Sequence, residues 1–202
     1  MKNAYEVCAG YRPMRRRVLR AAVASGLFAV TGIALAAPSV QEQRDDVRET
    51  ADDTLDRLYR AQPSAKQAIA RAAGYGAFSN FGMKILFAGG GSGKGLVVNN
   101  RTKQETFMKM IEVQAGLGLG VDKYRLVWVF ERPADLDQFV NSGWELGAQA
   151  TLTAQADGQG AQGFAGAVSV KPGVWLYQLS DEGLALDVTA KGTKYFRDDE
   201  LN

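Results

Sequence analysis

The periodicity of the apolar residues changes at Gly74, and this change constrains the fold more than any other feature of the sequence. Before it, the apolar side chains of residues 44–61 recur every three or four positions, as on one face of an amphipathic helix. They are Val47, Ala51, Leu55, Leu58 and Tyr59. Pro63 ends this helix, and a second, shorter helix is expected between Ser64 and Gly74. After Gly74 the pattern alternates and glycines are frequent, which indicates β-strands.

Several strands are expected after Gly74. They cover residues 77–88, 94–99, 106–120, 124–131, 144–156, 163–170, 174–179 and 184–190. Segment 124–131, YRLVWVFE, is mostly aromatic or β-branched, which predicts a central, buried strand around Trp128. One short helix, from Pro133 to Gly143, interrupts the strands. We therefore expect an α+β fold, with N-terminal helices followed by a rolled, barrel-like antiparallel β-sheet and one short inserted helix.

The residue composition excludes most catalytic chemistry. The chain has 202 residues, of which 46% are hydrophobic and 23% charged, as in ordinary globular proteins. It contains no histidine, which excludes every mechanism that needs an imidazole and the common zinc sites. Cys8 is the only cysteine, so neither a disulfide framework nor a multi-cysteine metal site can form. We expect a protein that is not an enzyme and has no catalytic residues, no metal site and no cofactor.

The N-terminus has the organisation of a secretory signal peptide. A basic segment, RRRVLR, precedes an apolar run over residues 21–37. A helix that spans a membrane needs about 20 strongly apolar residues, and this run is shorter. We therefore predict cleavage between Ala36 and Ala37 and export to the periplasm or cell envelope, with an uncleaved membrane anchor as the alternative. Arg15 and Arg16 also fit the twin-arginine export pattern, and the choice of export route stays open.

The excess of basic residues is confined to this N-terminal segment. Residues 1–36 contain six of the 24 Lys and Arg residues and one of the 22 Asp and Glu residues. The rest of the chain has 18 bases and 21 acids, a charge of about −3. A general nucleic-acid binder needs an excess of positive charge to neutralise phosphates. We therefore expect no nucleic-acid partner.

A cluster of basic residues lies around the glycine-rich segment GGGSGKG, residues 89–95. This segment lacks the Ser or Thr that follows the lysine of a phosphate-binding loop, so we predict a flexible hairpin turn between strands 77–88 and 94–99. The bases nearby outnumber a single acid, Glu105. They are Lys84, Lys94, Arg101, Lys103 and Lys109. Two interpretations stay open: a solvated hairpin face, or a site for an anionic lipid headgroup.

A second unusual feature is the segment AGLGLGV. Its glycines Gly116, Gly118 and Gly120 lie on one face of the predicted strand. Glycine weakens a strand unless the sheet curves tightly there or another group approaches its backbone. The small-residue face indicates tight curvature, or a helix lying against that face, or a surface or cavity shaped for a ligand such as a lipid chain.

The order of these segments resembles that of the SYLF domain family. The resembling segments are PSAKQAIARAAGYGAF, FGMKILFAGGGSGKGLVV, EVQAGLGLGVDKYRLVWVFE, SGWELGAQATLTA and VWLYQLSDEGLALDVTAKG, which together cover about residues 62–194. Each motif alone is weak, whereas their sequence along the chain is specific. The resemblance implies a non-enzymatic lipid-binding module. Eukaryotic relatives bind phosphoinositides, partly through an N-terminal amphipathic helix, some yeast relatives bind actin, and bacterial relatives are typically exported or lipid-anchored.

These observations predict three segments and a function. The segments are a signal peptide over 1–36, a helical segment over 37–61 and a SYLF-like lipid-binding domain over 62–202. We expect an exported protein that binds phospholipid through its headgroup, its acyl chain or both, with a phospholipid or membrane surface as partner. The first alternative is a structural or protein-interaction module of the envelope without a lipid ligand. The second is an enzyme that uses carboxylates alone.

Overall fold

A computed structural model describes residues 37–146, 151–152, 164–180, 183–185, 188–189 and 192–202. The predicted signal peptide, with the arginine pair and Ala36, lies outside these residues, so its cleavage and export route stay predictions. The first described residue is Ala37. Among the helices of the described part, none is long and apolar enough to cross a membrane.

Helix α1 (Val40–Ala61) is the predicted amphipathic helix, but it begins four residues earlier than expected. The reason is a capping box at its N-terminus. The Ser39 hydroxyl accepts a hydrogen bond from the backbone N–H of Glu42 at 3.2 Å, and the Glu42 carboxylate accepts one from the Ser39 N–H at 2.6 Å. The buried residues of the helix form one face, as the periodicity predicts. They are Val47, Ala51, Thr54, Leu55 and Leu58.

The other two helices are also where the sequence predicts helices. Helix α2 (Ser64–Arg71) follows Pro63 directly. Helix α3 (Pro133–Ser142) begins with proline in its first turn and ends at Gly143, whose φ of 68° favours glycine.

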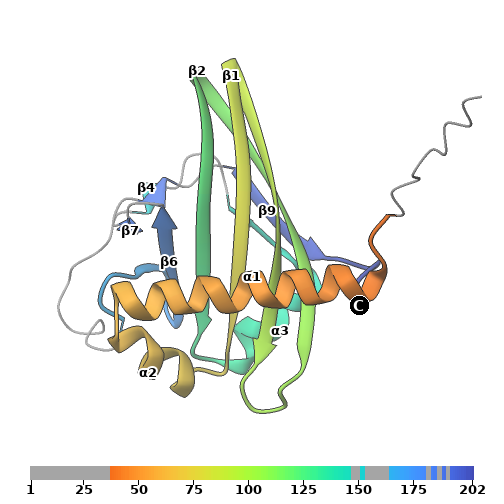
Figure 1. Cartoon of the computed structure of the whole chain (residues 1–202). Coiled ribbons are helices and arrows are strands. Elements are labelled where there is room, and N and C mark those ends of the chain that lie inside the picture. The colour runs from red at the N-terminus through yellow and green to blue at the C-terminus, as the bar shows by residue number, and fades with distance from the viewer. Residues whose placement is uncertain (1–36, 147–150, 153–163, 181–182, 186–187, 190–191) are drawn as a thin grey trace, which may run out of the picture. The chain divides into compact units, whose positions relative to one another are not determined.

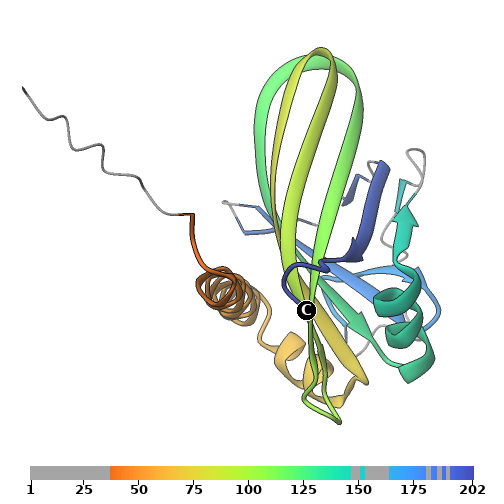
Figure 2. The same cartoon turned by 90° about the vertical axis from the view of Figure 1, so that its right-hand side faces the viewer.

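Two strands of 26 residues each, β1 (Gly74–Asn99) and β2 (Glu105–Phe130), dominate the fold. They pair along their whole length as one antiparallel hairpin, called the ribbon here, with Gly74 opposite Phe130 and Val98 opposite Glu105. The ribbon arches over in its middle (Figure 2), where the register shifts between Leu86 and Ala88. Gly118 pairs with Leu86 directly at this shift, and Gly120 pairs with Lys84 two residues away, so two glycines of the AGLGLGV segment lie at the irregular part of the ribbon.

The predicted turn over residues 89–95 is wrong. Those residues continue β1 and pair with β2, and the expected strands 77–88 and 94–99 are one strand, as are 106–120 and 124–131. The glycines do not form a turn. They allow the two halves of β1 to lie in close contact, because glycine has no side chain at the contact. A Cβ on Gly93 would collide with the Ser79 carbonyl oxygen, and one on Gly95 would lie 2.6 Å from the Ala77 oxygen.

Shorter strands extend the ribbon into a rolled antiparallel sheet, which confirms the predicted α+β fold class. Strand β6 (Val174–Ser180) pairs with the end of β2, and β9 (Gly192–Arg197) pairs with its beginning. The remaining strands are β3 (Trp144–Leu146) on β9, β5 (Val168–Lys171) and β7 (Gly183–Ala185) on β6, and the separate pair β4 (Thr151–Leu152) with β8 (Val188–Thr189). Strand β9 was not predicted from the sequence. Of the expected strand 163–170, only the part from Val168 is a strand in the described residues, whereas parts of the expected strands 144–156 and 184–190 lie outside the described residues.

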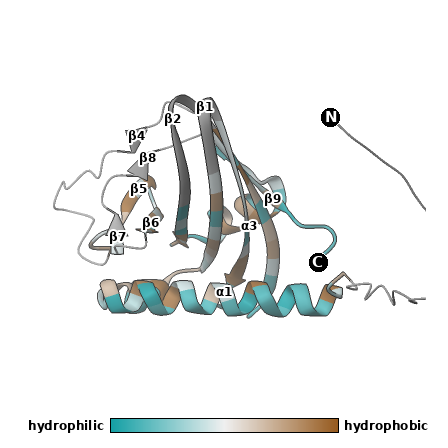
Figure 3. Cartoon of the chain, turned by 45° about the horizontal axis from the view of Figure 1, so that its top comes forward, coloured by the Kyte–Doolittle hydropathy of each residue, from teal (hydrophilic) through white to brown (hydrophobic). Residues whose placement is uncertain are grey.

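The ribbon separates two hydrophobic cores. Its inner face, which carries Trp128, packs against α3, and its outer face is covered by α1 and α2. Trp128 is fully buried, and its ring centroid lies 5.4 Å from that of Tyr195 and 5.7 Å from that of Phe139. The prediction of a central strand there is confirmed, because β2 pairs with β1 on one side and β6 on the other. Helix α1 crosses both long strands (Figure 1), and most of its residues are hydrophilic (Figure 3).

Candidate functional site: a cleft between helix α1 and the ribbon

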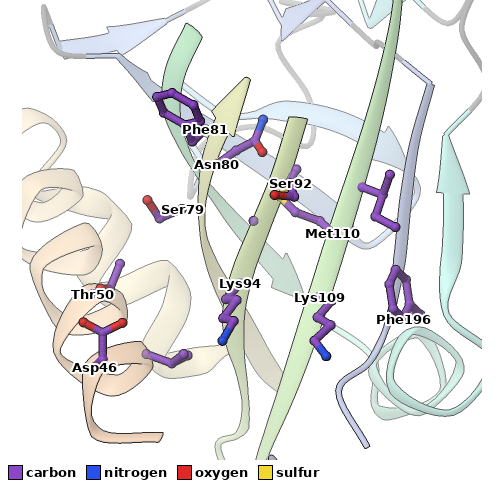
Figure 4. Close-up of a pocket in the computed structure, with 13 residues that line it drawn as sticks. Asp46, Thr50, Ser79, Asn80, Phe81, Ser92, Lys94, Lys109, Met110 and Phe196 are labelled. Carbon is purple, nitrogen blue, oxygen red and sulfur yellow. The ribbon is translucent and has the colours of Figure 1, made fainter. Parts of the chain in front are cut away.

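A cavity of about 490 Å³ lies between the N-terminal half of α1 and the outer face of the ribbon. Figure 4 shows side chains from α1, from both halves of β1, and from β2 and β9 around it. The apolar lining residues are Val47, Phe81, Met110, Ile111 and Phe196. The charged and hydroxyl-bearing ones are Asp46, Thr50, Ser79, Ser92, Lys94 and Lys109. The volume falls in the range of small-molecule sites, about 300–1,000 Å³.

The cleft exposes apolar side chains that a sheet under a helix would normally bury. Phe81 and Ile111 are each 48% exposed, and Val113, further along β2, is 64% exposed. Helix α1 covers the outer face from Val47 onward, where its buried residues begin. The ribbon therefore presents an uncovered apolar strip beside the helix, which is the type of surface that marks a binding site.

Two of the predicted basic residues meet at the cleft. Lys94 and Lys109 are directly opposite each other on β1 and β2, and both line the cavity. The Lys109 ammonium lies 2.8 Å from Asp198 and 3.2 Å from Glu200, and the hydrogen bond to Asp198 raises the pKa of Lys109. Lys94 donates a hydrogen bond to the neutral Gln43 amide oxygen at 3.2 Å. Lys109 is thus neutralised by its neighbours, and Lys94 is the cation that the cleft can offer to an anion.

The other three bases of the predicted headgroup site lie elsewhere. Lys84 pairs with Gly120 in the arch of the ribbon. Arg101 and Lys103 lie in the turn between β1 and β2, where the Asn99 side chain accepts a hydrogen bond from the Arg101 N–H at 3.0 Å. The structure thus brings Lys94 and Lys109 together and keeps the remaining bases apart. A headgroup site made of these residues stays a prediction, as does a ligand cavity on the small-residue face of Gly116, Gly118 and Gly120.

A second group of basic residues was not predicted. Arg57 on α1 and Lys123 and Arg125 on β2 line a cavity of about 390 Å³ next to the cleft. Lys123 and Arg125 alternate along the sequence and so share one face of the strand, which is a signal that sequence reasoning could have used. The third member, Arg57, reaches them only because α1 crosses β2 at this point.

The floor of the cleft is held by a buried polar pair. The Asn80 amide donates a hydrogen bond to the Glu112 carboxylate at 2.9 Å, and both side chains are almost completely buried on the inner face. The bond joins the first half of β1 to the first half of β2, two segments that do not pair with each other in the sheet. It therefore fixes the two layers of the folded ribbon relative to each other.

The lining of the cleft is suited to binding. Among the described residues, no group of three or more His, Cys, Asp or Glu side chains could hold a metal ion. The cleft offers an apolar wall and a few cations, which can bury an apolar chain and contact an anion.

Comparisons with known proteins support the predicted resemblance. Residues 111–202 match the family described as Las17-binding protein actin regulator, Ysc84. A curated relative, Beta cell expansion factor A of Aeromonas veronii, is 32% identical over 163 residues, which are 81% of this chain and 60% of that protein. The chain thus spans about 60% of the length of the relative it matches. The predicted resemblance is confirmed: residues 111–202 match the Ysc84, or SYLF, family, which is a family of binding modules, and the relative from Aeromonas veronii is of the same family.

Proposed function

We propose that this protein is an exported lipid-binding module of the cell envelope, and that an acyl chain binds in the cleft between α1 and the ribbon. The observation that carries the proposal is the cleft itself, about 490 Å³ in volume, with Phe81 and Ile111 half-exposed along it. Each methylene group that leaves water for such a wall contributes about 0.8 kcal/mol. A chain of several methylenes therefore gains enough to bind without many polar contacts.

A cleft-filling substitution tests the proposal. Thr50 lies on α1 and lines the cleft, so Thr50→Trp places a large ring where the acyl chain would lie. We expect it to weaken the binding of dodecanol, measured by titration calorimetry, by about tenfold or more, which is about 1.4 kcal/mol. The matched control is Glu49→Trp, which adds the same ring on the exposed side of the same helix. Equal dodecanol binding by both variants and by the unmodified protein would contradict the proposal.

The export half of the proposal has its own test. The apolar run before Ala37 is too short to span a bilayer, so we propose that the exported protein begins at Ala37. The intact mass of protein extracted from the cell envelope decides this, and a species that retains residues 1–36 would indicate an anchor instead.

A protein-interaction module is the second candidate, and a specific observation favours it. Phe81, Ile111 and Val113 are exposed apolar side chains on one face of the ribbon, as at many protein interfaces. The family description also names a protein-binding actin regulator. This candidate predicts that dodecanol does not bind and that no lipid co-purifies with the protein, as judged by mass spectrometry.

A further inference from the structure

We propose that the cavity lined by Arg57, Lys123 and Arg125 binds a phosphate group, and that this cavity and the acyl-chain cleft form one groove. The groove would hold a single-chain amphiphile that ends in a phosphate. The inference rests on the proposed acyl-chain site and adds the position and chemical class of the headgroup.

The two cavities share a wall. Ser79, Asn80 and Phe81 line both of them. On the helix side, Asp46 and Thr50 line the cleft and Arg57 lines the second cavity. These helix residues are four and seven positions apart, so they lie along the same side of α1. A ligand that follows α1 can therefore extend from one cavity into the other past Phe81.

The positive charge is concentrated in the second cavity. Arg57 and Arg125 share one carboxylate, that of Asp53, at 2.9 Å and 3.0 Å. Lys123 takes part in none of the ion pairs found among the described residues, and its ammonium lies 5.8 Å from the centre of the Phe81 ring. Among the side chains that the structure describes here, three cations thus face one carboxylate, that of Asp53.

At the opposite end of the groove, carboxylates outnumber cations. There Lys94 and Lys109 stand beside three carboxylates, those of Asp46, Asp198 and Glu200. An anionic group gains more from the end where the cations are in excess, because the field of each cation is not cancelled locally.

The side chains at the cationic end suit a phosphate. Arginine presents several N–H donors in a planar fork that matches phosphate oxygens. Arg125 is partly buried, is held in place by Asp53, and its Nε has no hydrogen-bond partner in the described part of the chain. Lys123 lies directly opposite Phe81 across the two strands, and Arg125 lies opposite Ser79. Phe81 therefore marks the boundary between the apolar part of the groove and the cationic part.

The experiment compares dodecyl phosphate, dodecanol and inorganic phosphate by titration calorimetry against the protein from Ala37 to Asn202 in its folded form. We expect dodecyl phosphate to bind more tightly than dodecanol. In Lys123→Gln, the affinity for dodecyl phosphate should fall about fivefold. In the double variant that also carries Arg57→Gln, it should fall about fivefold further, because each base contributes about 1 kcal/mol. Dodecanol binding should not change. Lys94→Gln is the matched control, since it removes one lysine from the same groove at the other end.

The outcomes separate the headgroup site from the acyl-chain site. If Lys94→Gln removes the preference for dodecyl phosphate and the Lys123 variants keep it, the headgroup site is wrong while the acyl-chain cleft stands. If inorganic phosphate binds as tightly as dodecyl phosphate and loses affinity in Lys123→Gln, the cavity is a site for free phosphate and the acyl-chain proposal fails. Equal binding of dodecanol and dodecyl phosphate in every variant would overturn the phosphate site.

Discussion

The two faces of the ribbon differ in how completely their side chains are covered. On the inner face, large side chains close completely around Trp128, whose ring lies within 6 Å of the rings of Phe139, Trp144 and Tyr195. On the outer face, α1 covers only part of the sheet and leaves Phe81 and Ile111 half-exposed. The difference shows that the inner face is closed throughout, whereas the outer face keeps an open cleft beside the core that α1 and α2 cover.

The largest effect should come from the inner face. Trp128→Ala removes a fully buried ring, and we expect it to lower the free energy of unfolding by about 3–5 kcal/mol. The corresponding truncation on the outer face, Phe81→Ala, should cost less than about 1 kcal/mol because that ring is half-exposed. Denaturant unfolding measures both. Similar losses in the two variants would show that the faces do not differ as described.

The next effect concerns the contact between the two halves of β1. Gly93→Ala places a methyl group against the Ser79 carbonyl oxygen and 2.8 Å from Met110 Cγ, so it should cost about 1–3 kcal/mol. Gly90→Ala is the matched control in the same segment, because its nearest neighbour, the Glu112 carbonyl oxygen, is 3.5 Å away. We expect Gly90→Ala to unfold thermally at a midpoint close to that of the unmodified protein, and Gly93→Ala to unfold at a lower temperature. A tolerated alanine at Gly93 would mean that the halves are not in contact.

These glycines also show what the sequence could and could not predict. The helices follow from local periodicity, so α1, α2 and α3 were all predicted, although α1 begins four residues earlier because the capping box at Ser39 was not predicted. The strand segments were predicted from their alternation, but the turn over residues 89–95 was wrong, since local glycine chemistry favours a turn. The contact that makes glycine necessary comes from Ser79, on the other half of the strand. Local patterns carry no information about such a contact.

The candidate site also contains residues that the sequence could predict and residues that it could not. Lys94 and Lys109 were predicted as part of one basic cluster, and strand pairing brings them together. The cluster of Arg57, Lys123 and Arg125 was missed because it combines a helix with a strand about 70 residues later, through the packing of α1 across the ribbon. A basic residue in an acidic helix gives no sign by itself of the partner it will face.

A smaller effect should come from the carboxylate that links the helix to the ribbon. Asp53→Asn removes the shared partner of Arg57 and Arg125 and should lower the free energy of unfolding by about 1 kcal/mol or less, because these ion pairs are partly exposed. The loss should shrink as salt is added. Asp56→Asn, on the exposed side of the same helix, is the control and should have no measurable effect on unfolding. The same Asp53 variant should bind dodecyl phosphate more tightly, since a competing negative charge is gone; weaker binding would contradict the cationic end of the groove.

The position of an acyl chain under α1 is the central claim, and nuclear magnetic resonance with a spin-labelled fatty acid tests it most directly. The unpaired electron broadens amide signals of residues near the bound chain. We predict that the amides of Thr50, Phe81 and Ile111 broaden, while those of Asp137 and Asn141, on α3 behind the ribbon, stay sharp. The Thr50→Trp variant should abolish the broadening. Signals that broaden around α3 but not along the cleft, or that do not broaden at all, would contradict the account.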